Sequence, residues 1–482
     1  MKLKAVTKTI LILSFASLLI ATFKEAHATN ETPVHNIDTG LDYDTIQDAI
    51  DAPQTLEDHT IHVDAGIYFE HVTVYKSLKL VGEDKGTTVI DAGGSGTVIN
   101  VTANNVDIRE FTLRNSGPDF DDKGTNLDHS SNTTIRGNFI KNNRWGIWLE
   151  FAENNTVREN TIHNSTSAGI YLGDSAGNNI NHNTITSAEY GMWLERSGSN
   201  IIIGNALMEN AMGISLTNDS NNNTVSGNTI ENNDEGIHLF SPSNRIHENT
   251  LTSNLYGIFS LHSGGNLIYR NNFIGNIVQA HLSESYVDIW DNGAEGNYWS
   301  DYTGDDRNGD GIGDTNTPHR GLDRYPLMDV WSRFRMFDVT LKGRTYHITT
   351  ISNSTIANFN FNHSLRQISF SVTGSSDADG FCNITVPKIL LRGSWSVFID
   401  TANVTADTVI IENDTHTFLY LTYGFTTHMV RIRASEALDT IPCMHWWIVG
   451  TLVLMGIVVV GIFFWTWKTR TTRRKESVHQ SE

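Results

Sequence analysis

Three sets of positions recur through the middle of the chain at intervals of 21 to 23 residues. Glycines of a Gly-Ile-x-Leu type unit stand at Gly146, Gly169, Gly191, Gly213, Gly236 and Gly257. A second, apolar set comprises Ile135, Val157, Ile180, Ile202, Val225, Ile246 and Ile268. The third set is Asn-x-Ile or Asn-x-Leu, at Asn138, Asn160, Asn183, Asn205, Asn228, Asn249 and Asn272. Each repeat therefore contains three short strands separated by turns.

Strands this short are stable only when they stack. A strand of three to five residues pairs with the same strand of the next repeat about 4.8 Å away, so its apolar residues form a continuous column. Asparagine tolerates the left-handed backbone of tight corners, stacked amides can hydrogen-bond to one another, and glycine fits where a Cβ would clash. The pattern predicts an all-β chain built on a right-handed parallel β-helix, with regular coils over residues 123–282 and the Ile135 set in one interior column.

The segments that flank these repeats have different patterns. Residues 29–122 contain a short helical pattern, which predicts an N-terminal cap followed by irregular first coils. Its apolar face consists of Ile46, Ala49 and Ile50. Residues 283–335 are expected to close the β-helix. Apolar and polar residues alternate over residues 336–440, which predicts a β-sandwich domain that serves as a stalk.

The two ends of the chain carry long apolar runs. Lysines precede an apolar run in residues 1–28, and small residues follow it, which is typical of a cleaved secretory signal peptide. Residues 445–467 are apolar, free of charge and bounded by tryptophans, so they predict a transmembrane helix. The tail 468–482 is basic and is therefore expected in the cytoplasm. We expect a single-pass protein of the cell membrane with its N-terminal ectodomain outside.

The net charge of −20 argues against a nucleic-acid partner, because phosphate binding needs a basic surface. The chain has two cysteines, Cys382 and Cys443, too few to hold the fold together, and whether they form one disulfide stays open. Glycan acceptor sequences of the Asn-x-Ser/Thr type occur in the later part of the chain. They begin at Asn353, Asn362, Asn383, Asn403 and Asn413.

The repeats of residues 37–330 resemble those of the family named for the periplasmic copper-binding protein NosD, an accessory of nitrous oxide reductase, and those of carbohydrate-binding proteins and sugar hydrolases. The stretch Asn297-Tyr-Trp-Ser-Asp-Tyr and the later Arg324-Tyr-Pro-Leu resemble a closing segment that is common in archaeal members. These motifs identify a scaffold and not an activity, because members of such a family differ in what they bind.

A glycine-rich acidic segment in the closing region has the spacing of a calcium loop. Oxygen donors fall at the first, third, fifth and ninth places, with glycine at the sixth and a backbone carbonyl at the seventh. The proposed ligands are Asp306, Asn308, Asp310, Ile312 and Asp314. The twelfth place is Thr317 and not a bidentate glutamate, so Asp305 or Asp323 would have to complete the site. The alternative is a polar turn that binds no metal.

Strand alternation predicts an outward column of aromatic residues. If Ile147 points inward, Trp148 points outward, and the same place in the next two coils holds Tyr171 and Trp193. Aromatic rings stack on the apolar faces of sugars, while the nearby carboxylates Glu150 and Glu195 could bind sugar hydroxyls. We therefore expect a glycan-binding strip. The alternative is that these rings stack on one another or lie under a neighbouring loop.

Two other kinds of site have less direct support. The acidic loop Asp119, Asp121 and Asp122, beside Asp128 and His129, contains carboxylates that could hydrolyse a glycosidic bond, although a solvated surface is the simpler interpretation. The resemblance implies copper, but the sequence does not support it. No His-x-His or Met-rich cluster occurs, and the histidines do not fall at one place in adjacent coils. They are His163, His182, His238, His247, His262 and His281.

We therefore expect a surface-anchored β-helix protein that binds extracellular polysaccharide or glycan without catalysis. Three alternatives stay open, namely a NosD-like accessory of copper-centre assembly, a polysaccharide-degrading enzyme and a purely structural surface protein. The sequence does not identify the glycan, the protein partners or the oligomeric state.

Overall fold

The computed structural model describes residues 32–283, 287–373, 380–424 and 427–437. The predicted signal peptide, transmembrane helix and basic tail lie outside these residues. Within the described part of the chain, no helix has both the length and the apolar character needed to cross a membrane. The chain divides into two compact units, the first ending at Ser332 and the second beginning at Arg333.

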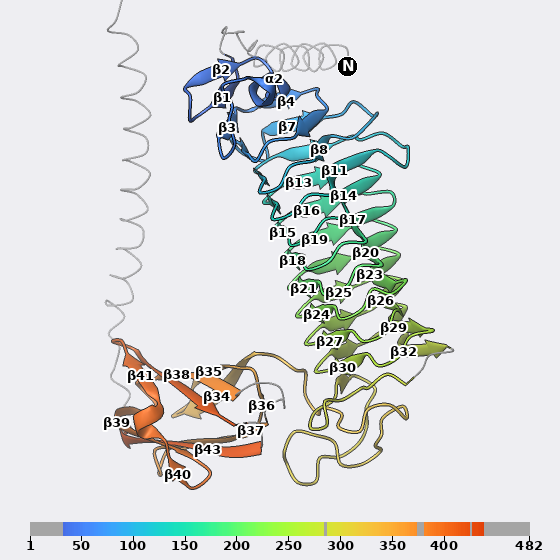
Figure 1. Ribbon diagram of the computed structural model, residues 1–482. Helices are drawn as coiled ribbons and strands as arrows, with labels where there is room; N and C mark the ends of the chain where they lie inside the picture. The colour runs from blue at the N-terminus through green and yellow to red at the C-terminus, as the bar shows by residue number, and fades with distance from the viewer. Residues whose placement is uncertain (1–31, 284–286, 374–379, 425–426, 438–482) are drawn as a thin grey trace, which may run out of the picture. The chain divides into compact units, whose positions relative to one another are not determined.

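The first unit is a parallel β-helix made of three long sheets (Figure 1). The 12-stranded sheet contains β1 (Val34–Asn36), β2 (Leu41–Tyr43), β3 (Thr60–Val63), β6 (Lys79–Gly82), β9 (Asp107–Arg109), β12 (Thr134–Arg136), β15 (Thr156–Arg158), β18 (Asn179–Asn181), β21 (Ile201–Ile203), β24 (Thr224–Ser226), β27 (Arg245–His247) and β30 (Leu267–Tyr269). The 11-stranded sheet contains β4 (Gly66–Tyr68), β7 (Thr88–Asp91), β10 (Thr112–Arg114), β13 (Phe139–Lys141), β16 (Thr161–His163), β19 (Thr184–Thr186), β22 (Ala206–Met208), β25 (Thr229–Glu231), β28 (Thr250–Thr252), β31 (Asn272–Ile274) and β33 (Tyr298–Trp299). The 10-stranded sheet contains β5 (Val72–Val74), β8 (Ile99–Val101), β11 (Lys123–Asp128), β14 (Trp145–Glu150), β17 (Ala168–Gly173), β20 (Tyr190–Glu195), β23 (Met212–Thr217), β26 (Glu235–Phe240), β29 (Tyr256–Leu261) and β32 (Val278–Ser283).

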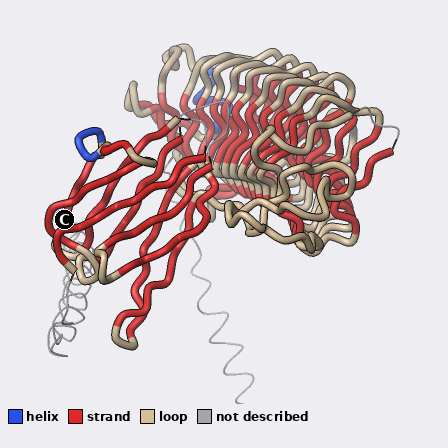
Figure 2. The backbone as a smooth tube through the Cα atoms, turned by 90° about the horizontal axis from the view of Figure 1, so that it is seen from below, coloured by secondary structure: helices blue, strands red, loops and turns tan. Residues whose placement is uncertain are grey.

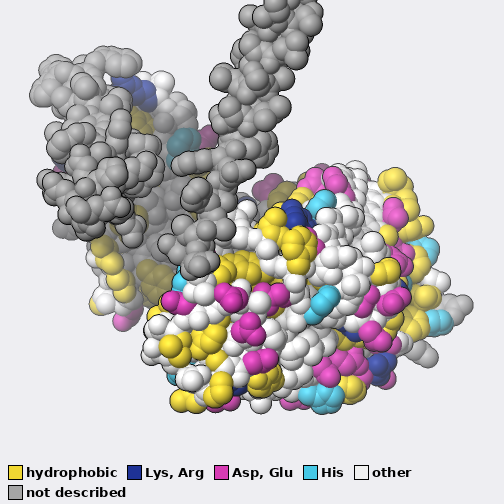
Figure 3. All heavy atoms as spheres, turned by 90° about the horizontal axis from the view of Figure 1, so that it is seen from above, with side chains coloured by type: hydrophobic (Ala, Val, Ile, Leu, Met, Phe, Trp, Pro, Cys, Tyr) yellow, Lys and Arg dark blue, Asp and Glu magenta, His cyan; other side chains and the backbone are white. Residues whose placement is uncertain are grey.

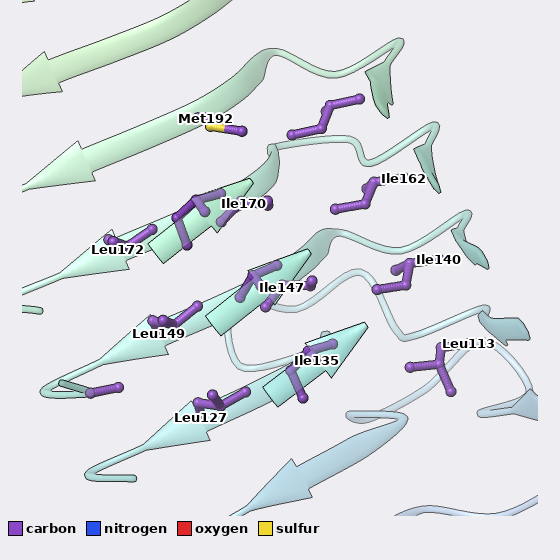
Figure 4. Packing of buried hydrophobic residues seen from close by; sticks show 14 of the residues in the cluster. Leu113, Leu127, Ile135, Ile140, Ile147, Leu149, Ile162, Ile170, Leu172 and Met192 are labelled. Carbon is purple, nitrogen blue, oxygen red and sulfur yellow. The ribbon is translucent and has the colours of Figure 1, made fainter. Parts of the chain in front are cut away.

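The predicted interior column is confirmed. Ile135 pairs with Val157, and the same parallel register continues through every later member to Ile268. All seven side chains are fully buried. Parallel columns from the other two sheets face them, so a continuous apolar core runs along the helix axis (Figure 4).

The asparagines form a hydrogen-bonded ladder between coils. Asn183 donates its backbone N–H and its Nδ2 to Asn205 Oδ1 at 2.9 and 3.0 Å, and Asn205 Nδ2 donates to the backbone oxygen of Ile180. The left-handed residue is the one before each ladder asparagine, for example His182 with φ 53° and Gly204 with φ 66°. The amide and the conformational role therefore fall on neighbouring residues and not on one asparagine.

The prediction that Asn272 is the next member of this ladder is wrong. Asn249 donates to Asn271 Oδ1 and not to Asn272. Asn272 lies one residue further on, in β31, and its side chain hydrogen-bonds the backbone of Trp331. The closing segment supplies this second set of partners, which the local sequence does not reveal.

The repeat glycines stand where adjacent coils approach most closely. A Cβ on Gly191 would lie 2.6 Å from the backbone oxygen of Gly213, and one on Gly213 would lie 2.5 Å from that of Gly236. Such contacts require the backbone to move. The predicted role of these glycines is confirmed.

Each end of the β-helix is closed by a different device. At the N-terminal end, α2 (Ile46–Asp51) buries Ile46, Ala49 and Ile50 as predicted, and the Thr45 hydroxyl caps it. At the other end, the buried Asp323 terminates the asparagine ladder. Its Oδ2 accepts hydrogen bonds from Asn297 N at 2.7 Å and from Trp299 Nε1 at 2.8 Å. Burial raises the pKa of Asp323 to about 6.

The second unit consists of two five-stranded antiparallel sheets that share one apolar core (Figure 2). One sheet contains β34 (Phe334–Leu341), β35 (Arg344–Ser352), β38 (Gly380–Pro387), β42 (His416–Tyr423) and β41 (Val409–Glu412). The other contains β36 (Thr355–Asn362), β37 (Gln367–Thr373), β43 (Thr427–Glu436), β39 (Arg392–Ile399) and β40 (Ala402–Asn403), with a 3-10 turn η1 (Thr405–Asp407) after it. Cys382 is buried in this core, and Cys443 lies outside the described residues.

Replacing Asn205 with alanine should lower the stability of the β-helix by about 3 kcal/mol, because two buried donors of Asn183 and the carbonyl of Ile180 would lose their partner. Thermal unfolding of the purified protein measures this as a lower Tm. The control is Asn181→Ala, which removes an amide from the outside of the preceding coil. Equal Tm values for the two variants would contradict the ladder's role.

Asp323 should make the unfolding free energy of the protein fall as the pH rises from about 4 to about 6. Between its ordinary pKa of 3.8 and its folded value of about 6, the folded state holds a proton that the unfolded state has released. Its contribution to the unfolding free energy therefore falls as the pH rises through this window. The Tm difference between the wild type and Asp323→Asn should shrink from pH 4 to pH 6. Asp219→Asn, on an exposed turn, is the control, and a constant difference would contradict the assignment.

Candidate functional site

The outward face of the 10-stranded sheet carries columns of residues in register. Asn100 pairs with Asn126, Asn126 with Trp148, and Trp148 with Tyr171, which pairs with Trp193. The column continues through Ser215, His238 and Phe259. The predicted alignment of Trp148, Tyr171 and Trp193 in successive coils is confirmed.

The exposure of these rings differs from the expected open strip. Trp148 is 6% and Tyr171 4% exposed, and their rings stack on each other with centroids 3.9 Å apart. Phe120, from the loop before β11, packs its ring edge-on against Trp148 at 5.4 Å. The open faces expected at these two positions are absent because the rings pack in a small cluster of their own, together with Trp145 and Ala168.

Trp193 lies at the margin of this cluster. Its ring is partly exposed, stacks on Tyr190 with centroids 4.8 Å apart, and donates from Nε1 to the Thr217 hydroxyl at 2.9 Å. It does not line the cleft described next. The three predicted rings therefore occupy different environments.

A cleft of about 860 Å³ lies over this face. Its lining comes from six successive strands of the sheet, β5, β8, β11, β14, β17 and β20, and from the segments that precede β5, β8 and β11 and follow β20. It brings together four of the five predicted glycan-site residues, namely Trp148, Tyr171, Glu150 and Glu195. Residues that sequence reasoning missed also line it, including His71, Asn100, Phe120, Lys123, Asn126 and Arg196.

Extending the outward column upstream would have found two of the missed residues. Asn100 and Asn126 occupy the place of Trp148 in the irregular first coils, and Asn126 Nδ2 donates to Asn100 Oδ1 at 2.8 Å. Phe120 and His71 follow no repeat. They reach the cleft from connecting segments, so only the folded chain reveals them.

A second outward column places carboxylates along one edge of the cleft. Asp128 pairs with Glu150, Glu150 with Gly173, and Gly173 with Glu195. A Cβ on Gly173 would lie 2.6 Å from Glu150 Oε2 and 2.7 Å from Tyr171 Oη. The glycine therefore leaves the space into which Glu150 and Tyr171 both reach.

Glu150 and Glu195 experience opposite electrostatic environments. Burial, and then the carboxylate of Asp174, raise the pKa of Glu150, whose Oε2 is buried without a hydrogen-bond partner among the described residues. Burial also acts to raise the pKa of Glu195, but hydrogen bonds from Asn218 and Tyr171 and the charge of Arg196 outweigh it and hold this pKa below its ordinary value. Tyr171 Oη donates to Glu195 Oε2 at 3.0 Å, and the pKa of Tyr171 is raised by burial and by that bond.

The cations of the cleft are already paired. Lys123 Nζ lies 3.5 Å from Asp121 and 5.0 Å from the centroid of the Trp148 ring. Arg196 contacts Asp174 at 2.9 Å and Glu195 at 2.7 Å. Acidic side chains are widespread and basic ones sparse on the face drawn in Figure 3, in keeping with the net charge.

The acidic loop considered for hydrolysis is divided by the fold. Asp121 and Asp128 line the cleft. Asp119 and Asp122 instead close a turn in which Asp119 N donates to Asp122 Oδ2 at 3.0 Å. His129 contacts Asp128 at 2.6 Å and is not part of the lining. The loop does not gather its carboxylates into one group.

The predicted calcium ligands lie in a tight turn in which their carboxylates accept backbone hydrogen bonds. Asp306 Oδ1 accepts from Gly309 N at 2.6 Å, Asp310 Oδ1 from Ile312 N at 2.9 Å, and Asp314 Oδ2 from Arg307 N at 2.7 Å. Asn308 Nδ2 donates to Asp310 Oδ2 at 3.1 Å. Calcium binding by this loop stays a prediction.

Asp323 is not available to complete that loop, because it is fully buried at the end of the asparagine ladder. Asp305 remains beside the loop, where its backbone oxygen accepts from Asp314 N at 2.8 Å.

Comparison with known proteins defines the family of this chain. The model described as "Periplasmic copper-binding protein (NosD)" matches residues 54–230 and 214–304, more than half of the chain. This chain belongs to the NosD family.

Two relatives are similar to parts of this NosD-family chain. A Pseudomonas aeruginosa "Probable ABC transporter binding protein NosD" is 41% identical over 95 residues, which cover 19% of this chain and 22% of that protein. A "Cell surface glycoprotein" of Methanothermus fervidus is 31% identical over 188 residues, 32% of this chain and 30% of that protein. The chain thus spans less than a third of the length of these relatives.

The solved structures that match part of this chain are more distant in sequence. The A-module of the Azotobacter vinelandii mannuronan C-5 epimerase AlgE4 has a TM-score of 0.43 and 17% identity, covering 50% of this chain and 75% of that one. DFA-IIIase from Arthrobacter chlorophenolicus has a TM-score of 0.35 and 13% identity, covering 45% and 58%.

Copper does not fit the residues of this NosD-family chain that the structure describes. No three His, Cys, Asp or Glu side chains among them are grouped to hold a metal ion, and this includes the aspartates of the predicted calcium loop. His238 pairs with Glu235 at 2.6 Å, and Phe259 stacks between His238 and His281. An aromatic ring thus separates the two histidines that share a column.

The calcium loop can be tested by thermal unfolding. Saturating calcium should raise the Tm of the purified protein, since a ligand at 100 times its Kd stabilises the folded state by about 2.7 kcal/mol. Asp310→Ala should abolish this rise, and Asp234→Ala, on an exposed turn of the β-helix, should keep it. A calcium response that survives in Asp310→Ala would exclude the loop.

Proposed function

We propose that this NosD-family protein binds an extracellular polysaccharide or glycan in the cleft of its β-helix, without catalysis. The observation that carries the proposal is the lining of the cleft, where the exposed ring of Phe120 shares one open space with amides and carboxylates of successive coils. Sugar rings offer apolar faces to aromatic groups and hydroxyls to polar ones, and this lining provides both kinds of partner.

The spacing of the coils suits a polymer. Six coils stacked at about 4.8 Å extend over about 24 Å, and one coil spacing is close to the length of one sugar unit. Successive units of a chain could therefore meet equivalent positions of successive coils. Binding at several positions along a polymer supplies avidity even where each contact is weak.

The proposed location is the cell surface. The Methanothermus fervidus relative is described as a cell surface glycoprotein. The apolar segments of residues 1–28 and 445–467 have the composition of a signal peptide and a membrane anchor. In this arrangement a right-handed β-helix is carried by a β-sandwich stalk on a single membrane span.

A polysaccharide-degrading enzyme is the second candidate. Glu150 and Glu195, with pKa values shifted in opposite directions, have the electrostatics of an acid and an ionised carboxylate. Two carboxylates of this kind, on either side of Gly173 in the strand register, are the minimum that glycoside hydrolysis needs. Release of reducing sugar from a bound polymer, lost in Glu150→Gln, would favour this candidate over binding alone.

Polymer retention tests the binding proposal. The purified full-length protein should be retarded on immobilised polysaccharide, and Asn100→Ala with Asn126→Ala should reduce retention at least tenfold, because these amides line the cleft. Asn179→Ala with Asn181→Ala is the matched control, an outward amide pair on β18. Trp148→Ala is unsuitable because that ring is buried. Equal retention of both double variants would refute the cleft as the binding site.

A further inference from the structure

We infer that the cleft selects a polymer of amino sugars with free ammonium groups, bound along the carboxylate edge at Asp128 and Glu150, and rejects polyuronates. This inference rests on the proposed function and adds the charge class of the glycan. It follows from which charges of the cleft are neutralised within the protein and which are not.

The carboxylate edge carries more negative charge than the cations beside it neutralise. Asp128, Glu150 and Glu195 stand at the ends of their strands, and Asp174 follows Gly173. Among the residues that line the cleft, Arg196 is the cation beside these carboxylates. It pairs with both Asp174 and Glu195. An excess of negative charge therefore remains at this edge.

Lys123 does not offset that excess. It begins β11, whereas Asp128 ends it, so about 16 Å of strand separates the two backbones. Its ammonium lies 3.5 Å from Asp121 and over the Phe120 and Trp148 rings. Its charge is therefore balanced by Asp121, which precedes β11, and not by the carboxylates at the other end of that strand.

Among the described carboxylates that line the cleft, Asp128 and Glu150 are the two without a permanent cation in contact. They are direct neighbours in the parallel register, about 4.8 Å apart along the axis. Asp128 contacts only the exposed His129 through its side chain, and Glu150 Oε2 has no hydrogen-bond partner among the described residues. A ligand ammonium placed between them would supply the missing charge and the missing donor.

The sign of the charge also excludes a class of ligand. A polyuronate would place a carboxylate in each sugar unit beside Asp128, Glu150 and Glu195, where like charges repel and lose their hydration. An uncharged sugar can hydrogen-bond to the same groups but compensates no charge. The expected order of affinity is therefore amino sugar, then uncharged sugar, then uronate.

Three hexasaccharides test this order on the purified full-length protein at low ionic strength. By calorimetry, a glucosamine hexamer should bind at least tenfold more tightly than an N-acetylglucosamine hexamer, and a galacturonic acid hexamer should bind least. Glu150→Gln and Asp128→Asn should each reduce the glucosamine advantage at least fivefold, because the amide that replaces the carboxylate can still hydrogen-bond to a neutral sugar but carries no charge. Glu231→Gln, an outward carboxylate on β25, should change neither affinity.

Other outcomes overturn the inference in separate ways. Tighter binding of the galacturonic acid hexamer, still dependent on Asn100 and Asn126, would refute the charge class and leave the proposed function standing. Displacement by tetralysine at equal concentration would show that a basic peptide is the better ligand. If no hexamer or polymer binds in a manner that depends on those two asparagines, the proposed function fails as well.

Discussion

Hydrogen bonding from one coil to the next is the constraint on which this protein depends. A three-residue strand has no stability of its own, so each must satisfy its backbone groups on the coils above and below. The asparagine ladder extends the same principle to the corners, where backbone donors would otherwise be buried without acceptors. Asn183 and Asn205 show the pattern, with one side-chain oxygen accepting two hydrogen bonds and one side-chain amide satisfying a carbonyl.

This constraint also explains which positions of a coil are free to carry different residues. The interior columns and the ladder positions are committed to stacking, and the glycines to close approach between coils. The outward positions of each strand are not needed for either purpose. Because the coils are in register, any residue placed outward falls in line with its equivalents, and a binding surface can be assembled one coil at a time.

The cleft combines such columns with one element that follows no repeat. Its floor is an aromatic cluster that fills its own space, with Trp148 stacked on Tyr171 and covered at its edge by Phe120. Its rim is a column of carboxylates interrupted by Gly173. That gap lets Glu150 and Tyr171 approach one point. Burial raises the pKa of Glu150, whereas hydrogen bonds and the charge of Arg196 hold the pKa of Glu195 below its ordinary value.

The amino-acid sequence by itself determined the parallel β-helix, its interior column, the N-terminal cap and the alignment of Trp148, Tyr171 and Trp193. Each of these depends on a repeat or on a local periodicity that can be counted along the chain. Counting would also have identified Asn271, since it follows Ile268 by three residues as Asn249 follows Ile246. Only the tertiary structure decided that Trp148 and Tyr171 are buried and that Asp323 ends the ladder. The reason is physical: Phe120 and Asp323 lie on connecting segments outside the repeat, so their contacts arise from the path of the folded chain and not from any period in the sequence.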